Sequence, residues 1–339
     1  MADDAGGPGS SGGTGVPVGS GGSGDRRGEV ADDAATAWRD RLGAVVAGAR
    51  SFARVHVVAE TDSTQDEALR VLSELGEPAE GRRGGLVVVA LRQRSGRGRL
   101  GRRWADTAGE GLALTAVIPA GDPGRLALVG AVAALVACTG ALRARGADAA
   151  PRGSCDASPP RDGDAWTREH VNGRPARAIG IKWPNDVVAS GRKLAGVLVE
   201  QDARVARLGV GINVAQRSWP PELAATATSL AELALGAQSA ARAEFLPPPD
   251  RIEVASRLVA ALDDALARPV AELVERFVEH DALRGARRAV AWGVERAEGT
   301  ILSIDPLRAI VVLRDDGSTV AIPAALARIE PAAERSDSG

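Results

Sequence analysis

A glycine- and arginine-rich stretch, residues 92–104, is the first part of this sequence that could do chemistry. It reads RQRSGRGRLGRRW and contains the glycine spacing GxGxxG. Glycine lets a backbone approach a ligand closely, and arginine donates charge-assisted hydrogen bonds to carboxylate and phosphate oxygens. The stretch therefore predicts an anion-binding loop, with Arg97 and Arg99 as the expected donors.

Three kinds of anion could occupy such a loop. A dinucleotide site uses the same glycine spacing, but its last glycine must open a helix that leads to a parallel strand. Here the segment after Trp104, ADTAGEGLALTAV, turns directly into a strand. A nucleic-acid site needs stacking rings, and only Trp104 lies nearby in a chain with three Phe and no Tyr. A loop that closes over a small ligand and a nucleotide phosphate fits better than either.

The second candidate is a pair of lysines. The chain has 42 Lys plus Arg residues, and only Lys182 and Lys193 are lysine. Lysine offers a compact charge that the planar arginine fork cannot imitate. The segments KWPND and SGRK predict a hairpin that returns Lys193 toward Lys182. Asn185 lies within the same turn, so we expect a cationic ligand site here.

These segments resemble the biotin protein ligases. The resemblance is carried by DSTQDEA, GRGRLGRRW, KWPNDV, KLAGVLVE, GVGIN and, more weakly, ATSLAEL, in this order over about residues 55–325. It implies an α+β fold: a catalytic domain of mixed sheet with flanking helices, related to the class II aminoacyl-tRNA synthetases, followed by a small SH3-like β-barrel. It also implies that biotin and ATP react to biotinoyl-5′-AMP and pyrophosphate, with Mg²⁺ assisting. Biotin then passes to a lysine of the biotin carboxyl carrier domain of an acetyl-CoA, propionyl-CoA or pyruvate carboxylase.

The resemblance further implies roles for individual residues. Three would be catalytic through positive charge: Lys193, Arg97 and Arg99. Biotin would contact Ser63, Thr64, Gln93, Gly96, Arg97, Gly98, Arg99, Lys193, Gly196 and Gly209. ATP would contact Arg97, Arg99, Trp104, Lys182, Asn185, Lys193 and Asn213, and Asp186 would be a ligand of Mg²⁺. Most relatives have Asn where this chain has Gln65, which we expect to alter a helix cap rather than the chemistry.

General electrostatics supports these roles. Adenylate formation brings a carboxylate up to a polyanion, and fixed cations between the two reduce their repulsion. Magnesium accompanies the leaving pyrophosphate. The reaction needs no Ser-His-Asp set, and the sequence offers none that we recognise.

Several elements must position these residues. Helices are predicted at 34–50, 64–75, 125–145, 226–235, 250–267 and 269–283. Strands are predicted at 54–60, 86–92, 112–118, 178–183, 186–189, 194–200 and 205–213. The expected domains are a Gly-rich tail at 1–33, a catalytic domain at 34–284 with an exposed insertion at 147–177, a small β-barrel at 285–330 and a tail at 331–339.

Composition excludes several classes of protein. The formal net charge of −2 argues against a general nucleic-acid binder. Residues 1–50 are too short for a winged helix-turn-helix in addition to the tail, so we expect no DNA partner. The two cysteines form no disulfide framework, and the sequence shows no signal peptide, which suits the cytoplasm. The seventeen-residue apolar run 126–142 predicts a buried helix rather than a membrane span.

Two rival functions remain. A lipoate or octanoyl transferase of the same fold would not be expected to combine the GRGRLGRR and KWPND segments with an SH3-like end. A nucleic-acid-binding protein using the arginine loop would bind without ATP and with a steep dependence on salt. The oligomeric state stays open between a monomer and a weak dimer.

Overall fold

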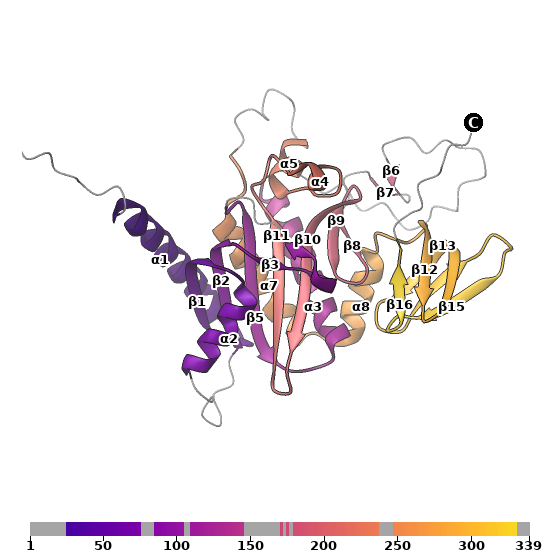
Figure 1. Cartoon of the computed structure of the whole chain (residues 1–339), viewed down its shortest axis with the longest axis horizontal. Coiled ribbons are helices and arrows are strands. Elements are labelled where there is room, and N and C mark those ends of the chain that lie inside the picture. Colours follow the sequence, from indigo (N-terminus) through magenta and orange to yellow (C-terminus); the bar gives the residue numbers. More distant parts are fainter. Residues whose placement is uncertain are drawn as a thin grey trace, which may run out of the picture.

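A seven-stranded mixed sheet organises the chain (Figure 1). The computed structural model describes residues 25–75, 85–104, 109–145, 170–171, 174–175, 179–236 and 247–330. Across the sheet the strands are β1 (Phe52–Thr61), β2 (Gly85–Gln93), β5 (Gly111–Pro119), β11 (Val205–Asn213), β10 (Arg192–Gln201), β9 (Asp186–Ala189) and β8 (Ile179–Lys182). β1 and β2 are parallel, and the other neighbours are antiparallel. The predicted mixed sheet with flanking helices is therefore confirmed.

Both faces of the sheet are covered, which explains the continuous apolar run of β2. Leu86 and Val88 pack on one face with Ala68 and Val71 of α2 (Thr64–Leu75). Val87 points to the other face and belongs to the large core. A strand buried on both faces loses the usual alternation of polar and apolar residues.

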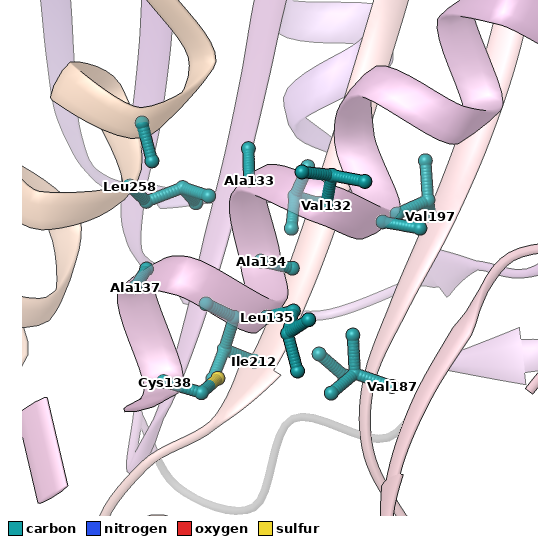
Figure 2. Close-up of a cluster of buried hydrophobic side chains, with 14 of the residues drawn as sticks. Val132, Ala133, Ala134, Leu135, Ala137, Cys138, Val187, Val197, Ile212 and Leu258 are labelled. Atoms are coloured by element: carbon teal, nitrogen blue, oxygen red, sulfur yellow. The ribbon is translucent and has the colours of Figure 1, made fainter. Parts of the chain in front are cut away.

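The face opposite α2 is covered by α1 (Asp25–Ala47), α3 (Pro123–Arg143) and α7 (Arg251–Ala267), and α8 (Val270–Glu279) packs against α3. Figure 2 shows Leu135 of α3 among Val187 and Ile212 from the strands. α3 is long and apolar enough to cross a membrane by composition alone, but most of it is buried inside the protein. The prediction of a buried helix is confirmed.

The C-terminal strands form a second, smaller sheet beyond α8 (Figure 1). Its order is β15 (Thr319–Pro323), β14 (Ala309–Leu313), β13 (Glu295–Asp305), β12 (Arg287–Trp292) and β16 (Ala327–Ile329), all antiparallel. In the described part of the chain no ladder joins β15 to β16, so the sheet is open. A small all-β end is confirmed, whereas closure into a barrel is not.

Some predicted boundaries differ from the structure. α1 begins at Asp25, inside the range predicted for the tail, because Ala-rich sequence extends the helix toward the N-terminus. The helix predicted at 226–235 is α5 (Leu230–Gly236), preceded by the short α4 (Pro221–Ala224). The helix predicted at 269–283 ends at Glu279.

Other predictions fall largely outside the described residues. The tail at 331–339 and most of both the N-terminal tail and the insertion at 147–177 are not described. Within the insertion, β6 (His170–Val171) pairs with β7 (Arg174–Pro175).

Candidate functional site

The site lies on the face of the sheet that α2 covers. Paired residues share a face, and every second residue along a strand points to the same side. Gly211 pairs with Gly196 of β10, and Gly209 pairs with both Leu198 of β10 and Thr115 of β5. The three glycines and Thr115 thus place small or polar residues on this face of three neighbouring strands, which leaves room for other groups against the backbone.

A buried polar cluster joins the start of α2 to this face. Gln93 Oε1 accepts hydrogen bonds from the Thr64 backbone N–H at 2.9 Å and from Thr64 Oγ1 at 3.2 Å. Thr115 Oγ1 donates to Thr64 Oγ1 at 2.9 Å, and the Gln65 N–H donates to Ser63 Oγ at 3.2 Å. Three of the residues predicted to contact biotin, Ser63, Thr64 and Gln93, thus lie together. Thr115 was not predicted, because it lies inside a strand that reads as plain core.

The Gln65 side chain binds the sheet, whereas the sequence leads us to expect an effect on the helix cap. Its Nε2 donates to the carbonyl oxygens of Leu198 at 3.2 Å and Arg207 at 3.3 Å. A Cβ at Gly209 would lie 2.6 Å from this nitrogen, so the glycine makes room for the glutamine. The Oε1 atom of Gln65 has no hydrogen-bond partner among the described residues.

The glycine- and arginine-rich stretch folds as a hairpin. β3 (Gly96–Arg97) pairs with β4 (Arg103–Trp104), and the 3-10 turn η1 (Arg99–Gly101) connects them. A Cβ at Gly96 would lie 2.4 Å from Gln93 Nε2, so this glycine permits close contact with the polar cluster. The described residues that follow the glycines form β4 and then β5 rather than a helix, so the dinucleotide interpretation is wrong.

Trp104 occupies the space that two glycines leave open. A Cβ at Gly211 would lie 2.5 Å from the indole ring, and one at Gly196 would lie 3.1 Å from it. Lys193 Nζ lies 5.4 Å from the centre of the same ring and 2.7 Å from Asp186 Oδ1. The lysine is thus held between an aromatic face and a carboxylate.

The KWPND turn meets the arginine loop. Lys182 pairs with Asp186 across the turn, and Asp186 pairs with Gly196 on the next strand. The Asn185 side chain donates to the Val197 carbonyl oxygen and accepts a 3.1 Å hydrogen bond from Arg99 Nη1. Two of the predicted ATP residues, Asn185 and Arg99, therefore lie in direct contact.

Asn213 fixes the beginning of β10. Its Nδ2 donates to the carbonyl oxygens of Lys193 at 3.1 Å and Thr228 at 2.9 Å. Thr228 N–H donates in turn to the Lys193 carbonyl at 2.9 Å. Both amide hydrogens are committed to the backbone, so only the Oδ1 atom of Asn213 is left to contact a base.

Arg97 lines an open cleft of about 720 Å³ beside the hairpin. Its guanidinium donates to both oxygens of Asp66 at 2.6 and 2.8 Å, and to Glu200 Oε2 at 3.2 Å. The Asp66 carboxylate raises the pKa of Arg97 above its usual value. Neither carboxylate was predicted, since a solvated acidic residue on a helix or strand carries no local signal of its distant partner.

The donor set for a metal is sparse. Among the described residues, no group of three or more His, Cys, Asp or Glu side chains is arranged to hold a metal ion. Asp186 and Asn185 stand near Lys193 and Arg99, respectively. Such a set fits only a cation that arrives with its own oxygen ligands, as Mg²⁺ does on nucleotide phosphates.

The sequence matches one protein family profile and several known proteins. The sequence profile described as the biotin/lipoate A/B protein ligase family matches residues 58–216. The biotin–[acetyl-CoA-carboxylase] ligase of Mycobacterium tuberculosis is 33% identical over 230 residues, 66% of this chain and 67% of that protein. The enzyme of the same name from Paracoccus denitrificans is 32% identical over 164 residues, 47% of this chain and 54% of that protein.

The fold has a solved counterpart. The biotin protein ligase of Aquifex aeolicus in complex with biotin and ATP superposes with a TM-score of 0.56 at 21% identity. The match covers 82% of this chain and 99% of that structure. With the sequence match to the mycobacterial relative, these findings show that the chain belongs to the biotin/lipoate A/B protein ligase family.

Proposed function

We propose that this chain is an ATP-dependent biotin protein ligase. The observation that supports it best is the juxtaposition of an uncharged polar cluster with a cationic one. Thr64 and Gln93 supply buried amide and hydroxyl groups suited to a neutral ureido ring. Lys193 and Arg99 supply positive charge suited to a carboxylate and a phosphate.

Adenylation then follows from fixed charges. Biotin lies with its ring toward the Thr64–Gln93 cluster and its carboxylate toward Lys193. The carboxylate oxygen attacks the α-phosphorus of ATP, an acyl-phosphate bond forms, and the bond to pyrophosphate breaks. Lys193 stabilises the negative charge that develops at phosphorus, because its side-chain nitrogen is already oriented by Asp186 and Trp104.

Magnesium supplies charge neutralisation for the leaving pyrophosphate when it is bound. Asp186, with Asn185 beside it, would hold the ion together with the phosphates of ATP. Lys182, exposed at the end of β8, would face the same polyanion.

The second half-reaction delivers biotin to a carrier protein. The acceptor is a lysine of a biotin carboxyl carrier domain, whose amine displaces AMP from the mixed anhydride. Acetyl-CoA, propionyl-CoA and pyruvate carboxylases are the candidate owners of that domain. We infer that the C-terminal strands act as the SH3-like part of the enzyme and that the reaction takes place in the cytoplasm.

ATP–pyrophosphate exchange tests the proposal. Purified protein should exchange labelled pyrophosphate into ATP when biotin is present and not when it is omitted. Exchange with lipoate or octanoate instead of biotin would move the substrate to the sister enzymes. Absence of exchange with all three acids would overturn the ligase assignment.

A further inference from the structure

The two loop arginines are in different situations. Arg99 has one neutral partner, Asn185, whereas Arg97 is bound at both terminal nitrogens by carboxylates. A guanidinium that donates in a two-pronged pair to one carboxylate and also to a second has little capacity left for a substrate anion. Arg97 is therefore poorly placed to act as a phosphate donor without first giving up Asp66.

The geometry of β3 also directs the Arg97 side chain toward the two carboxylates. Successive side chains of β3 point to opposite sides. Gly96 faces Gln93 and the Trp104 backbone, because its added Cβ would meet both. The Arg97 side chain accordingly leaves on the other side, where it meets Asp66 and Glu200.

The two carboxylates come from parts of the fold that the loop must close against. Asp66 lies in the first turn of α2, next to the residues of the polar cluster. Glu200 lies on β10 and also contacts Arg207, a largely buried arginine, at 3.5 Å. Arg97 thus connects the hairpin to α2 and to the sheet at once.

We propose that Asp66 anchors the loop by binding the Arg97 guanidinium, and that Glu200 is the second carboxylate that holds Arg97. Arg97 is then a positioning residue, and the loop presents its backbone N–H groups and Arg99 to the ligand. This inference rests on the proposed function, because it assigns the loop of that same site. It predicts that the Asp66 carboxylate keeps the loop in its folded conformation, and that the charge of Arg97 does not act on the substrate directly.

The first test is Asp66→Asn, with Asp62→Asn as the matched control. Asp62 also borders the cleft, but its carboxylate pairs with Arg94, outside the hairpin, at 3.1 Å. In the ligand-free protein, trypsin should cut after the loop arginines faster in Asp66→Asn than in wild type or in the control. In pyrophosphate exchange, the KM for biotin should rise about threefold to fivefold with kcat changed by less than about twofold.

The second test is a double-mutant cycle with Arg97→Gln. An anchor predicts that Arg97→Gln, which loses Glu200 as well as Asp66, raises the KM for biotin at least as much as Asp66→Asn, and that the double variant is no worse than Arg97→Gln alone. If Arg97→Gln lowered kcat about a hundredfold while Asp66→Asn behaved as wild type, Arg97 would contact the substrate and the proposal would fail. Unchanged trypsin cleavage in Asp66→Asn would equally overturn it.

Proteolysis and pyrophosphate exchange test the anchor and the ligase activity independently. Proteolysis is measured without substrates, so it reports on the anchor even if the protein exchanges no pyrophosphate. Wild-type protein without exchange would refute the proposed function, and the proteolysis result would still decide whether Asp66 holds the loop.

Discussion

Among single residues, Lys193 is the one whose substitution we expect to slow adenylation most. Its ammonium lies between the Asp186 carboxylate and the Trp104 ring, and its side chain is partly exposed. We expect Lys193→Ala to lower kcat for biotin-dependent pyrophosphate exchange by at least about a hundredfold, because an oriented charge at the reacting phosphate is lost. Lys193→Arg should recover little, since the planar fork cannot take the place of a point charge.

The control for Lys193 is thermal stability. Because the charge is partly solvated, both variants should unfold within about 2 °C of wild type. Inactive variants that unfold far earlier would mean that the loss reflects misfolding. Retained exchange in Lys193→Ala would remove Lys193 from the reaction.

Gln216 is a residue whose effect should be on stability. Its side chain is fully buried, and neither Nε2 nor Oε1 has a hydrogen-bond partner among the described residues. An unsatisfied buried amide costs about 1–3 kcal/mol, and an apolar side chain of similar shape avoids that cost. We therefore expect Gln216→Met to raise the melting temperature by about 2–6 °C in calorimetry. A lower melting temperature would show that the amide is satisfied in solution.

Among the structural elements, the β3–β4 hairpin depends on a pair of glycines beneath it. Gly211→Ala would place a methyl group 2.5 Å from the Trp104 ring, too close for contact without movement. We expect the hairpin to lift and the affinity for biotin to fall about tenfold in calorimetric titration, because the loop then closes less well. Trypsin should also cut the loop faster.

Gly121→Ala is the matched control for the hairpin. A Cβ at Gly121 would meet nothing within 4 Å, and Gly121 has no positive φ. This variant should bind biotin as wild type does. If Gly211→Ala also bound normally, Trp104 would not have to stay on the glycine pair for the loop to work.

Most elements could be predicted from local pattern, and contacts between distant elements could not. The apolar runs that form β2 and α3 predict burial from local sequence alone. The glycines Gly196 and Gly211 indicate that something presses on the strands, but the identity of that group as Trp104 emerges only from the sheet register. The same holds for Asp66 and its arginine partner, 31 positions apart.

At the level of the whole molecule, the two sheets share one hydrophobic core. Ile301 and Ile304 of the C-terminal sheet belong to the same buried cluster as the core of the main sheet. The Trp183 indole of the KWPND turn donates a 3.4 Å hydrogen bond to the Pro306 carbonyl oxygen. The boundary predicted at residue 285 therefore lies where the second sheet begins, while the hydrophobic core is continuous across it.

The response of the molecule to acid should depend on Asp263 of α7. Its carboxylate accepts hydrogen bonds from the backbone N–H groups of Arg50 and Ser51, which lie between α1 and β1. Burial raises the pKa of Asp263, but these hydrogen bonds and the Arg50 charge outweigh it, so the net pKa is lowered. A lowered folded-state pKa means that the contribution to stability is present above the ordinary pKa of an aspartate. That contribution is lost as pH falls through the lowered value.

Asp263→Asn should therefore melt below wild type at pH 7, and the gap should shrink as pH falls below the ordinary pKa of an aspartate and through the lowered folded-state value, where the wild-type carboxyl becomes protonated as well. The matched control is Asp264→Asn, whose carboxylate makes an exposed pair with Arg268 on the same helix. That pair is worth about 0.3–0.5 kcal/mol, so its variant should differ little from wild type at any pH. A gap for Asp263→Asn that stayed constant with pH would mean that shape, and not the ionised carboxylate, holds α7 to the α1–β1 connection.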